Sequence, residues 1–128
     1  MALILKINEP DSITVPVTCE QYGDNDKVIN ALKLKVTFRK TGKADWKREA
    51  EEADASVSDT GQNIMLRRKV ENIEGLPLER DGQPAKFDES AMDLVLEHSW
   101  IADDIWLALQ SINQGKKSDT LRRHLLKN

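Results

Sequence analysis

The sequence predicts an α+β fold, in which an antiparallel sheet of about three strands is followed by a mainly helical portion. Apolar and polar residues alternate with a period of two within residues 1–40, which is typical of half-buried strands. Apolar residues recur at helical spacing through much of residues 41–128. The length of 128 residues suits a single domain that contains both parts. A short hairpin-like turn is expected within the helical part, near residues 76–87.

The composition limits the classes of protein to which this chain can belong. Charged residues make up 32% and hydrophobic residues 39%, as in a globular protein with a polar surface. The net charge of −3 argues against a protein that coats nucleic acid, which should be strongly basic. Cys19 is the only cysteine, which excludes an internal disulfide and a cage of thiolate metal ligands. No long apolar run or signal peptide is recognisable, so we expect a cytoplasmic protein without a membrane span.

Three segments carry the strand pattern. The clearest covers residues 32–39, and weaker ones run from Leu3 to Ile7 and from Ile13 to Cys19. Pro16 cannot donate a hydrogen bond to a neighbouring strand, which places the second segment at an edge of the sheet. We therefore expect the spatial order 2-1-3, with the segment from Leu3 to Ile7 in the centre.

Two helices and a tight turn are predicted after the sheet. The first helix runs from Lys43 to Val57 and carries a narrow apolar stripe made of Trp46, Ala50, Ala53 and Val57. The second covers about Gln62 to Val70. The pair Asp81-Gly82 is typical of a type I′ turn, because both central residues of that turn have positive φ.

Three further helices are predicted in the last third of the chain. Asp88 is the expected N-cap of the first of them. The next begins at Ser99 and is ended by Gly115, which is a favoured residue just after a helix C-terminus. Ser118 is the expected cap of a last short helix.

A search for catalytic, cofactor-binding or metal-ligating residues yields none. His98 and His124 have no partners at motif spacing, and no glycine-rich phosphate loop or nucleophile elbow occurs. The segment Asp24 to Asp26 is similar to the start of a calcium loop, but the twelfth position holds Lys35 instead of a bidentate glutamate. The pair Asp103-Asp104 lies on a helix, where neighbouring side chains point about 100° apart and do not share a site.

Charge is distributed unevenly along the C-terminal half. Residues 71–104 hold ten acidic and two basic residues, whereas the segment from Lys116 to Lys127 holds five basic residues and one acidic residue. Such a basic end suits self-association or docking on a partner, and it equally suits folding back on the acidic helices of the same chain. Nucleic acid is not an expected partner, because no aromatic residue follows Trp106 to stack on bases.

Several short motifs lie between Leu66 and Trp106. They are Val70…Ile73-Glu74-Gly75-Leu76, Asp81-Gly82-Gln83-Pro84, Phe87-Asp88-Glu89, and Leu94…Leu96 followed by Trp100. Together with the strand-to-helix junction Val36 to Arg39, they resemble the tail assembly chaperones of long-tailed bacteriophages over about residues 31–112. Ile73 and Leu76 stand where that family commonly has tryptophan and valine, and the usual proline before Trp100 is lacking.

The resemblance implies a non-enzymatic chaperone without a cofactor. Such a protein binds the helix-rich tape-measure protein, keeps it soluble, and recruits tail-tube subunits in the host cytoplasm. It leaves before the tail is complete, so it is expected to be absent from the mature virion.

A helical client presents an apolar stripe, which requires a groove of adaptable side chains. Methionine repacks easily and tryptophan contributes strongly to interfaces, so the candidates are Met65, Met92, Trp100 and Trp106. Packing in the protein's own core is the alternative for all four. The basic candidates for partner binding are Lys116, Lys117, Arg122 and Arg123.

Two other functions stay open on the sequence. The chain could be a phage structural or connector protein, or another interaction module, that is kept in the mature particle. It could also be a small enzyme whose site is assembled across a homo-oligomer.

Overall fold

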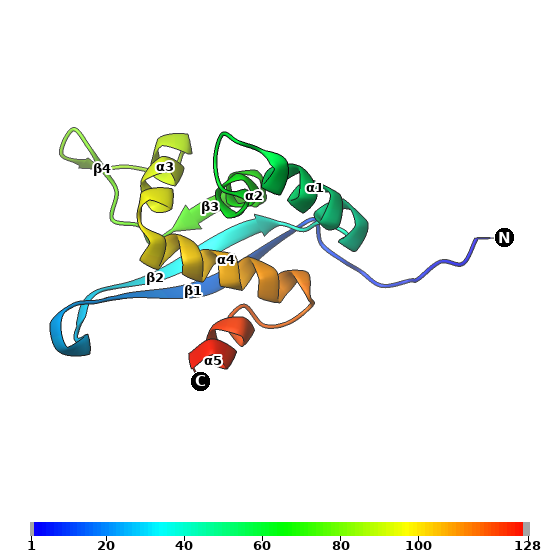
Figure 1. Ribbon diagram of the computed structural model, residues 1–128, viewed down its shortest axis with the longest axis horizontal. Helices are drawn as coiled ribbons and strands as arrows, with labels where there is room; N and C mark the ends of the chain where they lie inside the picture. The colour runs from blue at the N-terminus through cyan, green and yellow to red at the C-terminus, as the bar shows by residue number, and fades with distance from the viewer. Residues whose placement is uncertain (1, 127–128) are drawn as a thin grey trace.

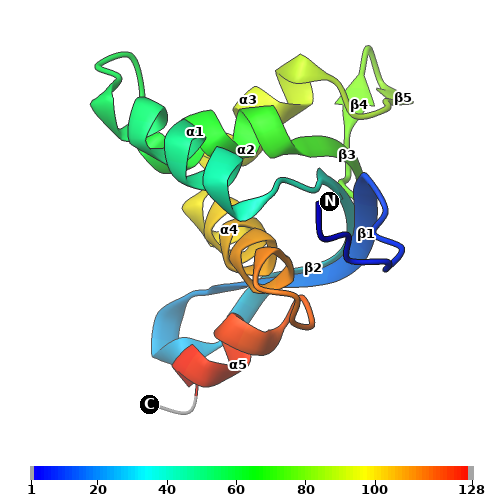
Figure 2. The same cartoon turned by 90° about the vertical axis from the view of Figure 1, so that its right-hand side faces the viewer.

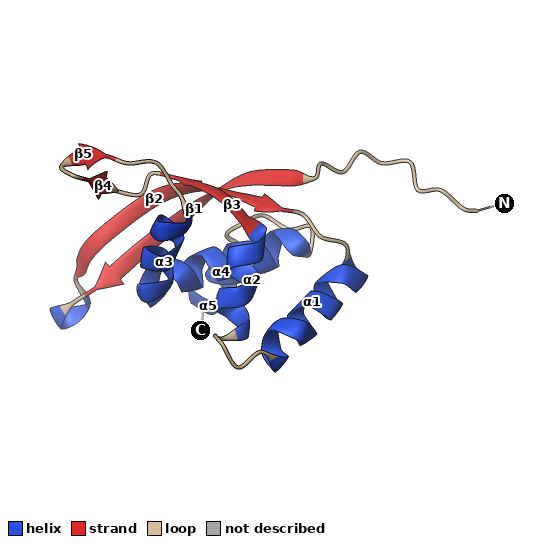
Figure 3. Ribbon diagram, turned by 90° about the horizontal axis from the view of Figure 1, so that it is seen from above, coloured by secondary structure: helices blue, strands red, loops and turns tan. Residues whose placement is uncertain are grey.

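A computed structural model describes residues 2–126 and confirms the predicted α+β class. An antiparallel sheet with the strand order β1-β2-β3 carries the helices on one face (Figures 1 and 3). A separate two-stranded hairpin, β4-β5, projects from the body. The elements in chain order are β1 Ser12–Tyr22, a 3-10 turn Asp24–Asp26, β2 Val28–Arg39, α1 Lys43–Ala55, α2 Gly61–Lys69, β3 Val70–Glu74, β4 Glu79–Arg80, β5 Gln83–Pro84, α3 Glu89–Glu97, α4 Ser99–Asn113 and α5 Thr120–Leu126.

Strands β1 and β2 form one long hairpin. Its register places Val17 opposite Leu34 and Ile13 opposite Phe38, on the face covered by the helices. The predicted edge position of Pro16 is confirmed, because β1 is an outer strand of the three. The Pro16 carbonyl points away from β2 and accepts a hydrogen bond from the Ser118 hydroxyl at 3.0 Å. The Leu121 N–H, which a cap at Ser118 would bind, donates instead to Ser111 Oγ at 3.1 Å, so the predicted role of Ser118 as a helix cap is wrong.

The prediction of a strand from Leu3 to Ile7 is wrong, and so is the spatial order 2-1-3. These residues are outside any strand, and the segment trails away from the body (Figures 1 and 3). The central strand is β2, which pairs with β1 on one side and with β3 on the other. Both sides of the C-terminal half of β2 are thus occupied, which leaves no place there for the N-terminal segment.

Strand β3 replaces the predicted end of a helix. Val70 was expected to close the second helix, but α2 ends at Lys69 and residues 70–74 pair with β2. Apolar residues at positions 66, 70 and 73 fit helical spacing, and a short run of this kind is ambiguous between helix and strand. Gly75 then turns the chain with a φ of +99°, where a β-carbon would lie only 2.6 Å from the Lys33 carbonyl oxygen.

The helix boundaries follow local capping chemistry. Helix α1 ends at Ala55, two residues short of the predicted Val57, whose side chain is fully exposed. The Asp88 carboxylate accepts a hydrogen bond from the Ala91 N–H at 2.9 Å, which confirms it as the N-cap of α3. Gly115 follows α4 with a φ of +72°, as predicted. Positive φ at Asp81 and Gly82 confirms the tight turn between β4 and β5.

The core lies between the inner face of the sheet and the helices. Helix α4 crosses the sheet between the α1–α2 pair and α5 (Figures 1 and 2). Its buried residues join those of β1, β2, α2, β3 and α3 in one hydrophobic cluster. Lys69 is buried beside this core, where it forms an ion pair with Glu49 and donates a hydrogen bond to Thr41 Oγ1 at 2.6 Å. Within residues 2–126, no helix combines the length and apolar character needed to cross a membrane.

Candidate partner-binding surface

An apolar groove lies between the distal half of the β1–β2 hairpin and the α3–α4 corner. Its volume is about 410 Å³, within the range of ~300–1,000 Å³ that is common for ligand pockets. Leu32 lines it from β2, the loop Leu76 to Leu78 from the side, and Leu94 and Trp100 from α3 and α4. Gln21, Asn30 and His98 supply the polar part of the lining. We call this feature the hairpin groove.

Trp100 brings a buried donor to the hairpin groove. Its indole nitrogen is buried and, among residues 2–126, has no hydrogen-bond partner. An unpaired buried donor costs roughly 1–3 kcal/mol, and the indole N–H can only donate. The neighbouring His98 lies in the junction between α3 and α4, with Nδ1 2.8 Å from the Leu94 carbonyl oxygen.

Exposed apolar side chains surround the hairpin groove. Leu94 is 50% exposed at its rim. Tyr22, Val28 and Ile29 are exposed at the tip of the β1–β2 hairpin, which projects past the helices (Figures 1 and 3). Large contiguous apolar patches on a protein commonly mark a binding surface.

The structure separates the four apolar residues that the sequence nominated for partner binding. Met65 and Met92 are 1% and 5% exposed, so neither side chain is accessible to a partner, and their nomination is corrected. Each lies on the inward face of its helix, where a flexible side chain fills the core. Trp106 is half-buried and stacks on Trp46, with ring centroids 6.0 Å apart and an interplanar angle of 27°. Only Trp100 lines the hairpin groove.

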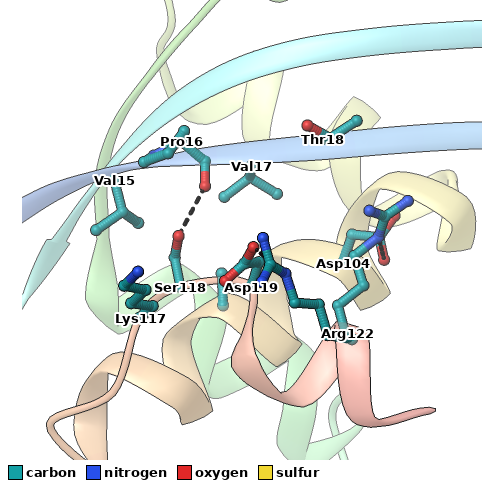
Figure 4. Close-up of a pocket in the computed structure, with 11 residues that line it drawn as sticks. Val15, Pro16, Val17, Thr18, Asp104, Lys117, Ser118, Asp119 and Arg122 are labelled. Atoms are coloured by element: carbon teal, nitrogen blue, oxygen red, sulfur yellow. Dashed lines mark hydrogen bonds and ion pairs between the residues drawn. The ribbon is translucent and has the colours of Figure 1, made fainter. Parts of the chain in front are cut away.

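A second, polar cleft lies between β1 and the C-terminal segment (Figure 4). Its volume is about 470 Å³, and Lys117, Arg122 and Arg123 line it. Arg122 reaches Glu20 at 3.6 Å and Asp104 at 3.5 Å.

The basic candidates therefore divide between residues that pair within the chain and residues that are exposed. Arg122 folds back on the chain's own acidic residues, while Arg123 pairs with Asp119 on its own helix at 2.6 Å. Lys116 and Lys117 are exposed. Lys127, the last residue of the predicted basic segment, is outside the described residues.

The residues considered for chemistry do not converge on one another. Asp103 accepts a hydrogen bond from Gln62 at 2.8 Å while Asp104 faces Arg122, so the two carboxylates serve different contacts, as predicted. Burial raises the pKa of Asp104, and the Arg122 charge opposes this shift. Cys19 is buried, and this burial raises the pKa of its thiol to about 12. Across residues 2–126, no three His, Cys, Asp or Glu side chains are grouped to hold a metal ion.

Sequence reasoning missed most of the hairpin groove. The sequence patterns place Leu32 in a strand and place Leu76 and Leu94 among the short motifs between Leu66 and Trp106, and none of these patterns indicates a groove. Their convergence depends on β3, which brings that loop beside β2 and was itself not predicted. In comparisons with protein-family models, curated proteins and solved structures, nothing matches this chain.

Proposed function

We propose that this protein is a non-enzymatic phage tail assembly chaperone, which binds the tape-measure protein, keeps it soluble and recruits tail-tube subunits. The observation that carries the proposal is the hairpin groove, with exposed Leu94 at its rim and the uncovered apolar hairpin tip beside it. The motif resemblance over about residues 31–112 supplies the class of client.

The groove suits an amphipathic helix of the client. Such a helix presents apolar anchors at positions i, i+3 or i+4, and i+7, and these need an apolar trough rather than a flat surface. Leu76 and Leu78 form one wall of the groove, and Leu94 with Trp100 forms another. Aromatic anchors in desolvated pockets contribute much of the affinity in known interfaces. Trp100 is therefore the residue whose loss should weaken client binding most.

Co-expression with the tape-measure protein tests the proposal. The wild-type protein should keep the tape-measure protein in the soluble fraction, and Leu94→Asp should abolish this by placing a charge at the groove rim. Leu125→Asp is the matched control, because Leu125 is a similarly exposed leucine on α5, outside the groove. Thermal unfolding should show that both variants stay folded. Equal client solubility with Leu94→Asp and wild type would refute the groove as the client site.

A structural or connector protein is the second candidate. The projecting hairpin tip and the exposed N-terminal segment favour it, because both could be covered in a permanent assembly. Mass spectrometry of purified phage particles distinguishes the two functions. A chaperone is absent from the particle, whereas a connector is present in stoichiometric amounts.

A further inference from the structure

The N-terminal segment has the character of a strand without a neighbour. Leu3, Ile4, Leu5 and Ile7 have exposed fractions between 59% and 102%. Alternation places Leu3, Leu5 and Ile7 on one side of an extended chain and Ile4 with Lys6 on the other. A run of exposed aliphatic residues is unfavourable in water and marks a segment that binds elsewhere.

This segment cannot reach the free part of its own sheet. Glu9 pairs with Lys40 at 3.1 Å, and the Asp11 carbonyl accepts a hydrogen bond from the Lys40 N–H at 2.8 Å. The segment therefore starts at the end of β2 where β3 already occupies the outer side. From there, Ala31 lies about 30 Å back along β2 at ~3.4 Å per residue, whereas residues 3–9 extend only about 20 Å.

The distal half of β2 has an unpaired side. Strand β3 pairs with residues 35–38 of β2 and ends there, so within residues 2–126 β1 is the only strand that pairs with residues 28–34. Pro16 points its carbonyl away from β2, and opposed residues of an antiparallel pair share this orientation. The backbone N–H and C=O of Lys35, which is opposite Pro16, therefore point toward β3. By alternation, the backbone N–H and C=O of Ala31 and Ile29 point to the same side, where no strand pairs with them.

The hairpin groove runs along this unpaired side. Asn30 and Leu32, on the inner face of β2, line it together with Leu78 and Trp100. A strand added beside residues 28–32, beyond the Lys33 carbonyl against which Gly75 packs, would hydrogen-bond to the backbone of β2 and direct alternate side chains into the groove. Residues 3–7 span about 14 Å when extended, and residues 28–32 of β2 also span about 14 Å.

We propose that residues 3–7 of one copy bind as an added strand to β2 of a second copy, with Leu3, Leu5 and Ile7 in the hairpin groove. A two-fold dimer lets each copy donate its segment and receive the other's. The occupant is the chain's own segment because it is strand-patterned, exposed, of matching length and unable to bind in its own copy. This self-association does not depend on the identity of any client, but the donated segment and the client proposed above would occupy the same groove, so a bound client should displace the segment.

Light scattering coupled to size exclusion of the full chain tests the donor segment. The wild type should be a dimer at micromolar concentration, and the triple variant L3S/L5S/I7S should be a monomer. Ile4→Ser is the matched control and should remain a dimer, because Ile4 is on the opposite side of the segment. A monomeric wild type at about 100 μM, or a triple variant that still forms dimers, would overturn the proposal.

Variants of β2 and of the hairpin groove test the site that receives the segment. Ala31→Pro removes the N–H that faces the unpaired side and leaves the β1–β2 pairing intact, and Leu78→Asp places a charge in the groove. Each should be monomeric alone, with circular dichroism reporting its fold. Mixing Ala31→Pro with L3S/L5S/I7S should restore a dimer, since one copy retains a segment and the other a groove. Absence of this heterodimer with both variants folded would refute strand addition.

The client assay separates this proposal from the proposed function. The L3S/L5S/I7S variant keeps its groove, so it should still keep the tape-measure protein soluble while remaining monomeric. Loss of dimerisation with retained client solubility supports strand addition and the chaperone function together. A dimer that survives all segment variants would overturn strand addition alone.

Discussion

Replacing Glu49 with leucine should destabilise the protein by about 3–5 kcal/mol, because it strands the buried Lys69 ammonium without a counter-ion. The Lys69 side chain is 4% exposed and that of Glu49 is 23% exposed. In the Glu49→Leu variant, Lys69 keeps its hydrogen bond to Thr41 Oγ1 but has no carboxylate partner at position 49. Lys69→Met should cost less, because the Glu49 side chain that it leaves behind is more exposed than that of Lys69. The double variant should lie within about 1 kcal/mol of the wild type, since two apolar side chains replace the pair.

Urea unfolding followed by tryptophan fluorescence measures all three free energies. Lys69 donates a hydrogen bond to Glu49 and holds the pKa of that carboxyl below its ordinary value of 4.5. The stabilisation is therefore complete above pH 4.5 and is lost as the pH falls through the lowered pKa of the folded state. The gap between wild type and Glu49→Leu should close in acid. A loss below 1 kcal/mol at pH 7, or a double variant as unstable as Glu49→Leu, would refute the reasoning.

Three further outcomes are expected. Cys19 should react with a thiol reagent at pH 8 far more slowly in the folded than in the urea-unfolded protein, because burial raises its pKa to about 12. Gly75→Ala should cost roughly 2 kcal/mol and more than Gly82→Ala in chemical unfolding, since both have positive φ but only the former meets a backbone oxygen. Asp104→Asn should flatten the fall in stability as the pH rises above 3.8, because the folded state raises the pKa of this carboxyl and favours its protonated form.

The strand over residues 32–39 and the three C-terminal helices could be predicted because their signals are local, but the pairing of β1 with β2 could not, since the expected order 2-1-3 separates these two strands. Strict alternation over residues 32–39, an aspartate at the start of α3 and a glycine after α4 each specify structure through a few neighbouring atoms. The tight turn at Asp81-Gly82 belongs to the same class, since its backbone conformation depends on those two residues.

The central pairing of the sheet could not be predicted, because it depends on which segment occupies the second side of β2. Residues 3–7 have the stronger strand pattern, yet residues 70–74 hold that position. Helix α2 ends beside β2 and delivers them there, whereas the N-terminal segment leaves from β1 on the opposite side. The hairpin groove could not be predicted for the same reason, because its lining residues come together only when β3 pairs with β2.

The burial of Met65, Met92 and Lys69 was also beyond the sequence. The flexible side chain of methionine is suited to an exposed binding groove, which is why Met65 and Met92 were candidates. The same flexibility also suits methionine to fill a core, and both residues are buried. Lys69 closes the basic run Arg67-Arg68-Lys69, which suggests a solvated face. Its burial requires the acidic partner on α1, 20 residues earlier, and that contact has no sequence signature.

The separation in sequence between the sheet and the helix that covers it has a consequence during translation. Phe38 and Ile105 belong to one buried cluster, but about 70 residues lie between them. At ~5–20 residues per second, the ribosome needs roughly 4–14 s to make that stretch. The apolar face of the nascent β1–β2 hairpin therefore stays exposed for seconds. Chaperones that bind at the ribosomal exit tunnel have this interval in which to bind it.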